Sequence, residues 1–371
     1  MKFVALQEAS TEESRVAIVP EVAQRLVRAG HRVALQSQAG ARAGFHDSSY
    51  THASTEVGTD VRALVADADV VIAVGRPSEA TVKGLRQGTV VIGMLQARTD
   101  PIGVKALATQ GVSAFSMELV PRTARAQRLD ALSSQASLAG YKSVLIAAAS
   151  LGKYFPMLMT AAGTVPPARV LVLGAGVAGL QAIATARRLG AVVEAYDVRP
   201  VVKEQVQSLG ARFIEVPQVS GAEAAGGYAR EQSADEQAAQ RALLKKHVSD
   251  ADVVITTAAV PGRKAPVLVT DDMLDEMRPG SVVIDLAAET GGNVSATKPG
   301  ETVDRKGVYI QGPVNLPASM PYHSSLLYSR NVMGFIELIV DKEGKLKLDF
   351  TDDVVAAMCV AHAGEVRLKT T

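Results

Sequence analysis

Three glycines in the middle of the chain have the spacing of a phosphate-binding turn. Gly174, Gly176 and Gly179 follow an apolar run, 169–173, and open a helical pattern. In a strand–turn–helix unit such glycines allow a tight turn, close approach of a pyrophosphate to the backbone, and close packing of the helix on the strand. The N-terminus of the helix presents unpaired N–H groups and its positive dipole end to the phosphates. The spacing therefore predicts a dinucleotide site, with a purely structural glycine turn as the alternative.

An acidic residue stands where the ribose of such a nucleotide would lie. Asp197 directly follows a second apolar run, 191–196, and is 18 residues beyond Gly179. A carboxylate at this place hydrogen-bonds a ribose 2′-hydroxyl and repels a 2′-phosphate, so the sequence favours NAD(H) over NADP(H). Arg199 keeps NADP(H) open as an alternative, because an arginine can pair with that phosphate.

A second group of polar residues lies between the apolar run 113–116 and a long helical stretch, 129–154. It contains Arg122, Gln127, Asp130 and Ser133. Following a strand of the first predicted sheet, it should lie at the carboxyl edge of that sheet, where open α/β sheets bind ligands. Asp130 and Ser133 could instead only cap the helix, and the arginines could be solvated. Spacing alone leaves both interpretations open.

The histidines offer no recognisable acid–base machinery. An enzyme that moves a hydride to or from an alcohol or amine also moves a proton, and histidine is the usual proton carrier. We expect all six histidines to be surface or helix-end residues, because each follows a helix-ending glycine, lies in a polar stretch or ends a helix. They are His31, His46, His52, His247, His323 and His362.

Composition excludes several classes of function. The net charge of +1 gives no sign of a nucleic-acid or membrane-surface binder. The single cysteine, Cys359, excludes an internal disulfide framework and a cysteine-built metal site, so we expect a buried thiol and no metal. The first residues lack the apolar core of a signal peptide, and the longest apolar stretch, 144–151, is far shorter than the roughly 18 residues of a membrane span. We therefore expect a soluble cytoplasmic protein.

Short β-rich runs alternate with helical patterns along almost the whole chain, which is typical of parallel α/β sheets. A helical pattern at 324–340 follows the last strands and is expected to pack back on the first domain. The predicted fold is therefore α/β, with two Rossmann-like, doubly wound parallel-sheet domains, the second inserted into the first and joined to it by long helices. The predicted domains are 1–139 with 316–371, and 140–315. The predicted strands cover 2–7, 32–36, 70–74, 90–94, 113–116, 169–173, 191–196, 212–216, 253–257, 282–285 and 308–310.

One long segment, 217–235, has no clear period. Long aperiodic loops in compact domains are often functional lids, although an ordinary solvated loop is the alternative.

Taken together, these motifs resemble the NAD(H)-binding component of proton-translocating nicotinamide nucleotide transhydrogenases, within the alanine dehydrogenase/transhydrogenase superfamily. The similarity runs from end to end. The polar loop from Arg122 to Ser133 and the Gly-Gly-Tyr of the long loop are its most specific features. The segments that carry it are 13–17 with Pro20, 122–133, 226–229, 260–266 and 284–293.

The resemblance implies a role for each candidate residue. Arg122 and Ser133 would contact the nicotinamide end of NAD(H), with Asp130 holding Arg122 or the carboxamide. Gln127 would reach toward a second nucleotide, NADP(H), on a partner subunit. Tyr228 would shield the site, and Asp197 would bind the adenosine ribose. The remaining implied cofactor-binding residues are Ala175, Val177, Ala178, Val198, Arg199, Gly227, Ala258 and Pro261, beside the three glycines.

Hydride transfer between two nicotinamide rings moves no substrate proton, so the missing histidine fits this family. The task left to the protein is to bring the rings together and orient them. The resemblance also implies a homodimer that docks on separate membrane-spanning and NADP(H)-binding subunits, which would place it at the inner membrane without insertion. No nucleic-acid partner is implied.

Two other functions compete with this interpretation. Alanine dehydrogenases of the superfamily use a lysine and a histidine around the keto acid, where this chain has Arg76 and the run 95–97, Leu-Gln-Ala. Glu289 replaces their active-site aspartate, although Arg15, which would bind the keto-acid carboxylate, is retained. The other alternative is a non-enzymatic NAD-binding regulatory protein, against which the intact polar loop argues.

Overall fold

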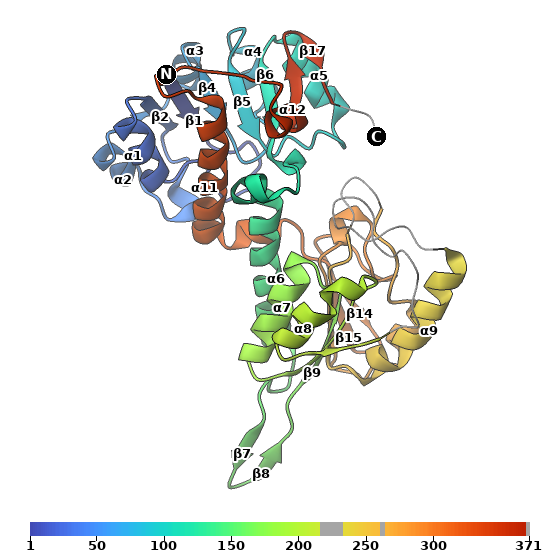
Figure 1. Cartoon of the computed structure of the whole chain (residues 1–371). Coiled ribbons are helices and arrows are strands. Elements are labelled where there is room, and N and C mark those ends of the chain that lie inside the picture. Colours follow the sequence, from blue (N-terminus) through green and yellow to red (C-terminus); the bar gives the residue numbers. More distant parts are fainter. Residues whose placement is uncertain (216–232, 260–263, 369–371) are drawn as a thin grey trace. The chain divides into compact units, whose positions relative to one another are not determined.

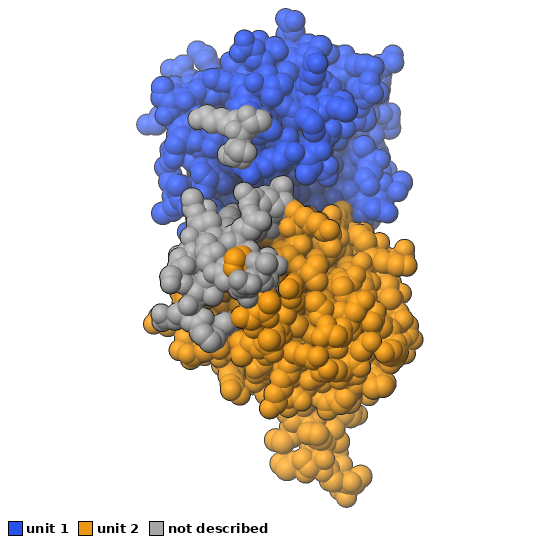
Figure 2. Space-filling model, turned by 90° about the vertical axis from the view of Figure 1, so that its right-hand side faces the viewer, with its two compact units in different colours: residues 1–135, 317–371 blue, residues 136–316 orange. Residues whose placement is uncertain are grey.

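The computed structural model of the chain describes residues 1–215, 233–259 and 264–368 (Figure 1). It separates into two compact units, called unit 1 and unit 2 below. Unit 1 contains residues 1–135 and 317–371, and unit 2 contains residues 136–316 (Figure 2). Both units are α/β, as the sequence predicts.

Unit 1 contains an eight-stranded sheet in the order β17-β16-β6-β5-β4-β1-β2-β3. The six strands from β6 to β3 are parallel, while β16 and β17 are antiparallel additions at one edge. The strands are β1 (Lys2–Ala5), β2 (Arg32–Gln36), β3 (Glu56–Gly58), β4 (Val70–Ile72), β5 (Val90–Gly93), β6 (Ser113–Ser116), β16 (Cys359–His362) and β17 (Glu365–Val366).

Helices cover both faces of this sheet, which explains why its central strands are continuously apolar. One face packs against α1 (Pro20–Arg28), α11 and α12 (Asp353–Met358), and the other against α3, α4 and α5. Helix α11 (Pro321–Ile339) buries Tyr328 and Phe335 beside Phe3 of β1, so the late helical pattern does pack on the first domain. The other helical segments are η1 (Ala41–Ala43), α2 (Asp47–His52), α3 (Val61–Ala66), α4 (Glu79–Lys83), α5 (Pro101–Thr109), η2 (Met117–Leu119), η3 (Ala124–Leu129) and η6 (Leu316–Ser319), which precedes α11.

Unit 2 contains a seven-stranded sheet in the order β11-β10-β9-β12-β13-β15-β14, parallel except for β14. Helices α6 (Ala131–Ser150), α7 (Val177–Arg188) and α8 (Lys203–Ser208) cover one face, and α9 (Ala234–Asp250) and α10 (Asp271–Asp275) cover the other. The strands are β9 (Arg169–Leu173), β10 (Val192–Tyr196), β11 (Arg212–Phe213), β12 (Val253–Thr256), β13 (Val282–Asp285), β14 (Thr302–Arg305) and β15 (Val308–Gln311). Two short 3-10 helices, η4 (Pro200–Val202) and η5 (Ala288–Thr290), lie in its loops.

The parallel strands of the two units follow the same order. The first strand of each unit, β1 or β9, pairs with the second strand on one side and with the fourth strand on the other. This doubly wound order creates a switch point beyond the carboxyl ends of the first and fourth strands, where such sheets bind ligands. In unit 2 the switch point lies between β9 and β12, and β9 leads directly into the glycine turn.

Several sequence-based expectations were wrong in detail. The strands β3, β7, β8, β14, β16 and β17 were missed, because they are short, exposed or at sheet edges, where the apolar pattern is weak. The strand expected at 212–216 ends at Phe213, and the helix expected at 129–154 covers only Ala131–Ser150. His31 is buried against the ring of Phe3 rather than exposed, and its burial lowers its pKa.

A two-stranded hairpin extends from unit 2 without joining its main sheet (Figure 1). It pairs β7 (Leu158–Thr160) with β8 (Gly163–Val165) in antiparallel register. Its surroundings carry exposed apolar side chains, with Met159 78% and Met157 56% exposed. An isolated hairpin of this size is marginally stable in water, so its apolar side chains are unusual for a free surface.

Candidate functional site

The glycine turn of unit 2 has the geometry that its spacing predicts. Gly174 follows β9 with φ +103°, a backbone conformation that L-residues with side chains rarely adopt. A Cβ there would stand 2.6 Å from the hydroxyl oxygen of Thr257, which donates a hydrogen bond to the Gly174 carbonyl. The turn is therefore packed tightly against the end of β12.

The other two glycines have different surroundings. A Cβ on Gly179, in the first turn of α7, would overlap the carbonyl oxygen of Gly174, so this glycine is needed for the helix to pack on the turn. A Cβ on Gly176 would meet no atom within 4 Å. Gly176 precedes α7 and has no side chain to cap the helix, so the N–H groups of the first turn, beginning at Val177 and Ala178, face open space. An anion such as a pyrophosphate fits this position.

Asp197 is tied to both the glycine turn and Arg199. Its Oδ2 accepts a hydrogen bond from the N–H of Ala175 (2.7 Å). Its two oxygens also accept from the Arg199 guanidinium, at 2.9 Å from Nε and 2.8 Å from Nη2. Both side chains are largely buried, so the fork between them fixes the carboxylate beside the turn. Val198 lies between these two residues in the chain.

Ala258, after β12, is held by a residue that the sequence motifs do not single out. The Asn293 side chain accepts from the Ala258 N–H (3.0 Å) and donates to the Ala258 carbonyl (2.8 Å), as a neighbouring strand would. Asn293 is fully buried. Its side chain also donates to the carbonyl of Pro266, so a single amide joins the two loops that follow β12 and β13.

A buried carboxylate at the end of β13 organises the same loops. Among the described residues, five neutral groups donate hydrogen bonds to Asp285. The hydroxyls of Thr256 and Thr297 donate to it at 2.9 and 2.7 Å. The backbone N–H groups of Ala287, Asn293 and Val294 donate at 2.8 to 3.1 Å. An aspartate ending a buried strand was the available sequence signal, and its donors come from parts of the chain that only the fold assembles.

In unit 1, the polar loop forms η3 and the first turn of α6. Asp130 accepts from the backbone N–H of Ser133 (2.9 Å) and from its hydroxyl (2.6 Å), so these two residues do cap the helix. Arg122 and Gln127 are exposed. The structure thus brings Asp130 and Ser133 into contact.

Two groups of ion pairs anchor η3 to the C-terminal segment of unit 1. Arg125 makes a fork with Asp352, at 2.6 and 2.9 Å, and also pairs with Asp353. The hydrogen bond from Arg125 lowers the pKa of Asp352 to about 2. Arg128 pairs with Glu337 of α11 at 2.6 Å. The arginines of this segment are therefore not merely solvated.

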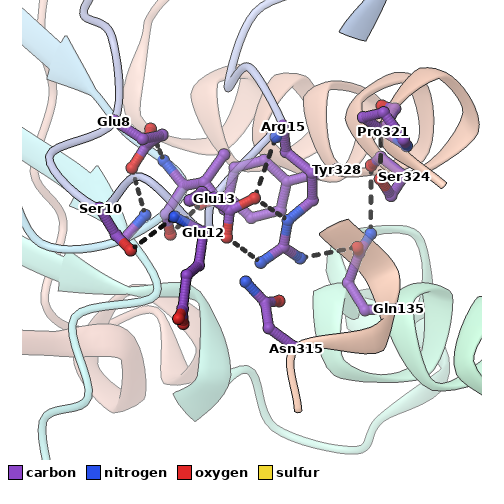
Figure 3. Close-up of polar contacts among 12 residues, drawn as sticks. Glu8, Ser10, Glu12, Glu13, Arg15, Gln135, Asn315, Pro321, Ser324 and Tyr328 are labelled. Carbon is purple, nitrogen blue, oxygen red and sulfur yellow. Dashed lines mark hydrogen bonds and ion pairs between the residues drawn. The ribbon is translucent and has the colours of Figure 1, made fainter. Parts of the chain in front are cut away.

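Arg15 lies in a buried ion pair of unit 1 (Figure 3). Its Nε and Nη2 donate to the carboxylate of Glu13 at 2.8 and 2.6 Å, and its Nη1 donates to the side-chain oxygen of Gln135 at 2.8 Å. The side chains of Arg15 and Glu13 are 5% and 9% exposed. These groups occupy the guanidinium donors that a substrate carboxylate would need.

Glu8 occupies the switch point of unit 1. Its carboxylate accepts from the backbone N–H groups of Val74 and Gly75, at 2.7 and 2.9 Å. Burial raises its pKa to about 7, in spite of these two hydrogen bonds. A pocket of about 230 Å³ adjoins it, lined also by Gln36 and Arg76.

Three predicted site residues, Gly227, Tyr228 and Pro261, lie outside the described residues, together with most of the expected lid. Within the described ranges, no cluster of three or more histidine, cysteine or acidic side chains could hold a metal ion. No helix of the described chain has the length and apolarity needed to cross a bilayer. Cys359 is buried, and burial raises the pKa of its thiol.

The two doubly wound units and the dinucleotide-type turn define the class of protein: a two-unit α/β protein with a Rossmann-type nucleotide site. Residues 4–139 match the family model "Alanine dehydrogenase/PNT, N-terminal domain", and residues 143–369 match "Alanine dehydrogenase/PNT, C-terminal domain". The chain therefore belongs to the alanine dehydrogenase/PNT family, as the sequence motifs indicated.

Similar proteins span the whole chain. It is 44% identical to the first portion of the NAD(P) transhydrogenase subunit alpha of Rhodospirillum rubrum, a separate chain, over 99% of this chain and 97% of that one. It is 30% identical to an alanine dehydrogenase of Halomonas elongata, over 99% of this chain and 94% of that protein. Among solved structures, a transhydrogenase from Sinorhizobium meliloti superposes with a TM-score of 0.86 at 42% identity, covering 99% and 98% of the two chains.

Proposed function

We propose that this chain is the NAD(H)-binding subunit of a proton-translocating nicotinamide nucleotide transhydrogenase. The observation that carries the proposal is the 44% identity to a transhydrogenase subunit alpha chain across 97% of that chain's length. In this proposal a hydride passes directly between NAD(H) bound here and NADP(H) bound on a partner subunit. A separate membrane-spanning subunit couples the transfer to proton movement.

The geometry of unit 2 supports nucleotide binding there. The open space at Gly176 and the first turn of α7 suits a pyrophosphate, and the fixed carboxylate of Asp197 suits a ribose hydroxyl. The fork between Asp197 and Arg199 occupies the arginine that could otherwise attract a 2′-phosphate. These features favour NAD(H) over NADP(H).

The polar loop would orient the nicotinamide end. We assign Arg122, Asp130 and Ser133 to the carboxamide and ribose of the bound nucleotide, and Gln127 to the approach of the second one. Direct transfer between two nicotinamide rings needs no general acid or base, and effective proximity and orientation can contribute about 7–11 kcal/mol to the barrier. Arg122 and Gln127 are exposed to solvent, so a nucleotide can reach both side chains.

An alanine dehydrogenase is the main rival, since one relative of this chain bears that name. The surroundings of Arg15 disfavour it, because Glu13 and Gln135 occupy the guanidinium that would bind a keto-acid carboxylate. The chain also has leucine, glutamine and alanine at 95–97, where the rival activity would place a histidine. A non-enzymatic regulatory protein would have no use for the polar loop.

We further propose that the chain forms a homodimer through the β7–β8 hairpin. The exposed Met157 and Met159 would be covered by a second copy, which would relieve the marginal stability of a free hairpin. Attachment to the membrane would come from the partner subunits.

A mixing assay tests the proposed function. The purified chain is incubated with NADH and NADP⁺, with and without the NADP(H)-binding subunit, and NADPH is measured with alanine plus NAD⁺ as a control reaction. We expect transfer only when both proteins are present. A Gln127→Asn variant should keep its affinity for NADH and transfer the hydride much more slowly. Turnover of alanine by the chain alone would contradict the proposal.

A further inference from the structure

Asn331, on helix α11 of unit 1, contacts the polar loop at two points. Its side-chain oxygen accepts a hydrogen bond from the Ser134 hydroxyl at 2.7 Å, and its side-chain nitrogen donates to the carbonyl of Arg128 at 2.8 Å. Arg128 lies near the end of η3 and Ser134 in the first turn of α6. The two contacts therefore lie on either side of Asp130 in the chain.

Only an amide satisfies both contacts. The Arg128 carbonyl is solely an acceptor, so the nitrogen of Asn331 must face it, and the oxygen is left for Ser134. Asn331 is 8% exposed, so water cannot readily replace a missing partner. An aspartate would keep the hydrogen bond from Ser134 and place a negative oxygen against the carbonyl. A leucine would leave both loop groups without the amide partner.

The same face of α11 packs closely against the loop. Gly334 lies one turn after Asn331, and a Cβ there would stand 3.5 Å from side-chain atoms of Arg128 and Leu129. Glu337, a further three residues along, pairs with Arg128. The spacing of three residues places these groups on one side of the helix. They form a continuous seat for the segment that leads into Asp130.

We propose that Asn331 is a positioning residue that fixes the junction between η3 and α6, and thereby holds Gln127, Asp130 and Ser133 in the arrangement that hydride transfer requires. The catalytic half of this inference rests on the proposed function. The structural half does not, because it concerns the order of the loop itself.

Amide hydrogen exchange in the full-length chain tests the structural half. Two variants each remove one contact: Asn331→Asp removes the bond to Arg128, and Ser134→Ala removes the bond from the hydroxyl. We expect exchange at the Asp130, Ser133 and Ser134 amides to quicken about tenfold in each, as expected for losing about one buried hydrogen bond. Amides of β9 and β12 should be unchanged. Arg330→Gln, on the same helix but paired with Glu21, is the matched control and should leave the loop amides unchanged.

Transfer assays with the NADP(H)-binding subunit test the catalytic half. We expect Asn331→Asp to lower the transfer rate about tenfold, while the Kd for NADH changes less than about twofold, since loss of orientation affects the reacting geometry more than binding. Unchanged exchange at the loop, or equal quickening throughout unit 1, would overturn the inference, and so would normal transfer in a variant with a loosened loop. If the wild-type chain transfers no hydride, the proposed function fails, and the exchange data still decide whether Asn331 fixes the loop.

Discussion

Single side chains at the strand ends of both units hold loops in place. Asp285 and Asn293 do this in unit 2, and Glu8 does it in unit 1 by accepting from two consecutive N–H groups after β4. Each is a polar group in the interior whose partners come from other segments of the chain. Such groups stabilise one loop conformation only while every partner is present.

Glu8 should make the stability of the chain depend on pH. Its folded-state pKa is raised to about 7 from an ordinary 4.5, by burial first and by the nearby Glu13 in addition, with Arg15 acting in the opposite direction. Between these values the unfolded chain releases the proton and the folded chain retains it, so the free energy of unfolding falls as pH rises. The contribution is at most about 3 kcal/mol.

We therefore expect Glu8→Gln to gain stability relative to the wild type as pH rises from 5 to 8. Denaturant unfolding at several pH values measures this difference. The exposed Glu12→Gln is the control and should follow the wild-type profile. Parallel profiles for Glu8→Gln and the wild type would show that Glu8 does not retain its proton.

Asp197 should set the preference between nucleotides. Asn at this position can still accept from the Ala175 N–H, but it loses the charge that binds Arg199. We expect Asp197→Asn to weaken NADH binding about tenfold and to strengthen NADPH binding, because the repulsion ends and Arg199 is released. Fluorescence titration measures both, with the exposed Glu204→Gln as control. An unchanged NADH/NADPH ratio would contradict this assignment.

At the scale of elements, the strand–turn–helix unit β9–α7 separates structural glycines from the one that leaves room for a ligand. Gly174 and Gly179 are required by contacts within the protein, whereas Gly176 has open space before it. Its backbone, with φ −75°, is accessible to alanine. The two glycines that frame the start of α7 should therefore respond differently to the same substitution.

We expect Gly176→Ala to leave the thermal midpoint within about 2 °C of the wild type and to weaken NADH binding at least about tenfold, because the methyl group occupies the space for the pyrophosphate. Gly179→Ala should instead lower the thermal midpoint by several degrees, because α7 must move away from the Gly174 carbonyl. Calorimetry with NADH titration distinguishes the two. Normal binding by Gly176→Ala would favour the purely structural interpretation of the turn.

At the scale of the whole molecule, two doubly wound units with the same parallel strand order share one chain, and each has apolar cores on both faces of its sheet. They differ at the first turn: unit 2 has glycines there, and unit 1 has Glu8. Unit 2 also carries the hairpin, whose exposed apolar side chains are well suited to self-association.

We expect Met159→Glu to convert a dimer to a monomer, because a charge cannot be buried in an apolar contact without a partner. Light scattering after size-exclusion chromatography measures the mass. Ile102→Glu, at an equally exposed apolar residue of unit 1, should leave the dimer intact. A monomeric wild-type chain, or a dimeric Met159→Glu chain, would contradict the proposed interface.

The sequence by itself determined the features that depend on local chain chemistry. The glycine turn, the buried parallel strands and the capping of α6 by Asp130 are written in spacing and apolar pattern, so they could be predicted. The strand order, the hydrogen bonds that hold Ala258 and Asp285, and the contact of Asn331 with the loop could not, because their partners are up to about 200 residues apart in the chain. Arg15 is the sharpest case: as a motif residue it suggested a substrate ligand, and only the tertiary structure paired it with Glu13 and Gln135.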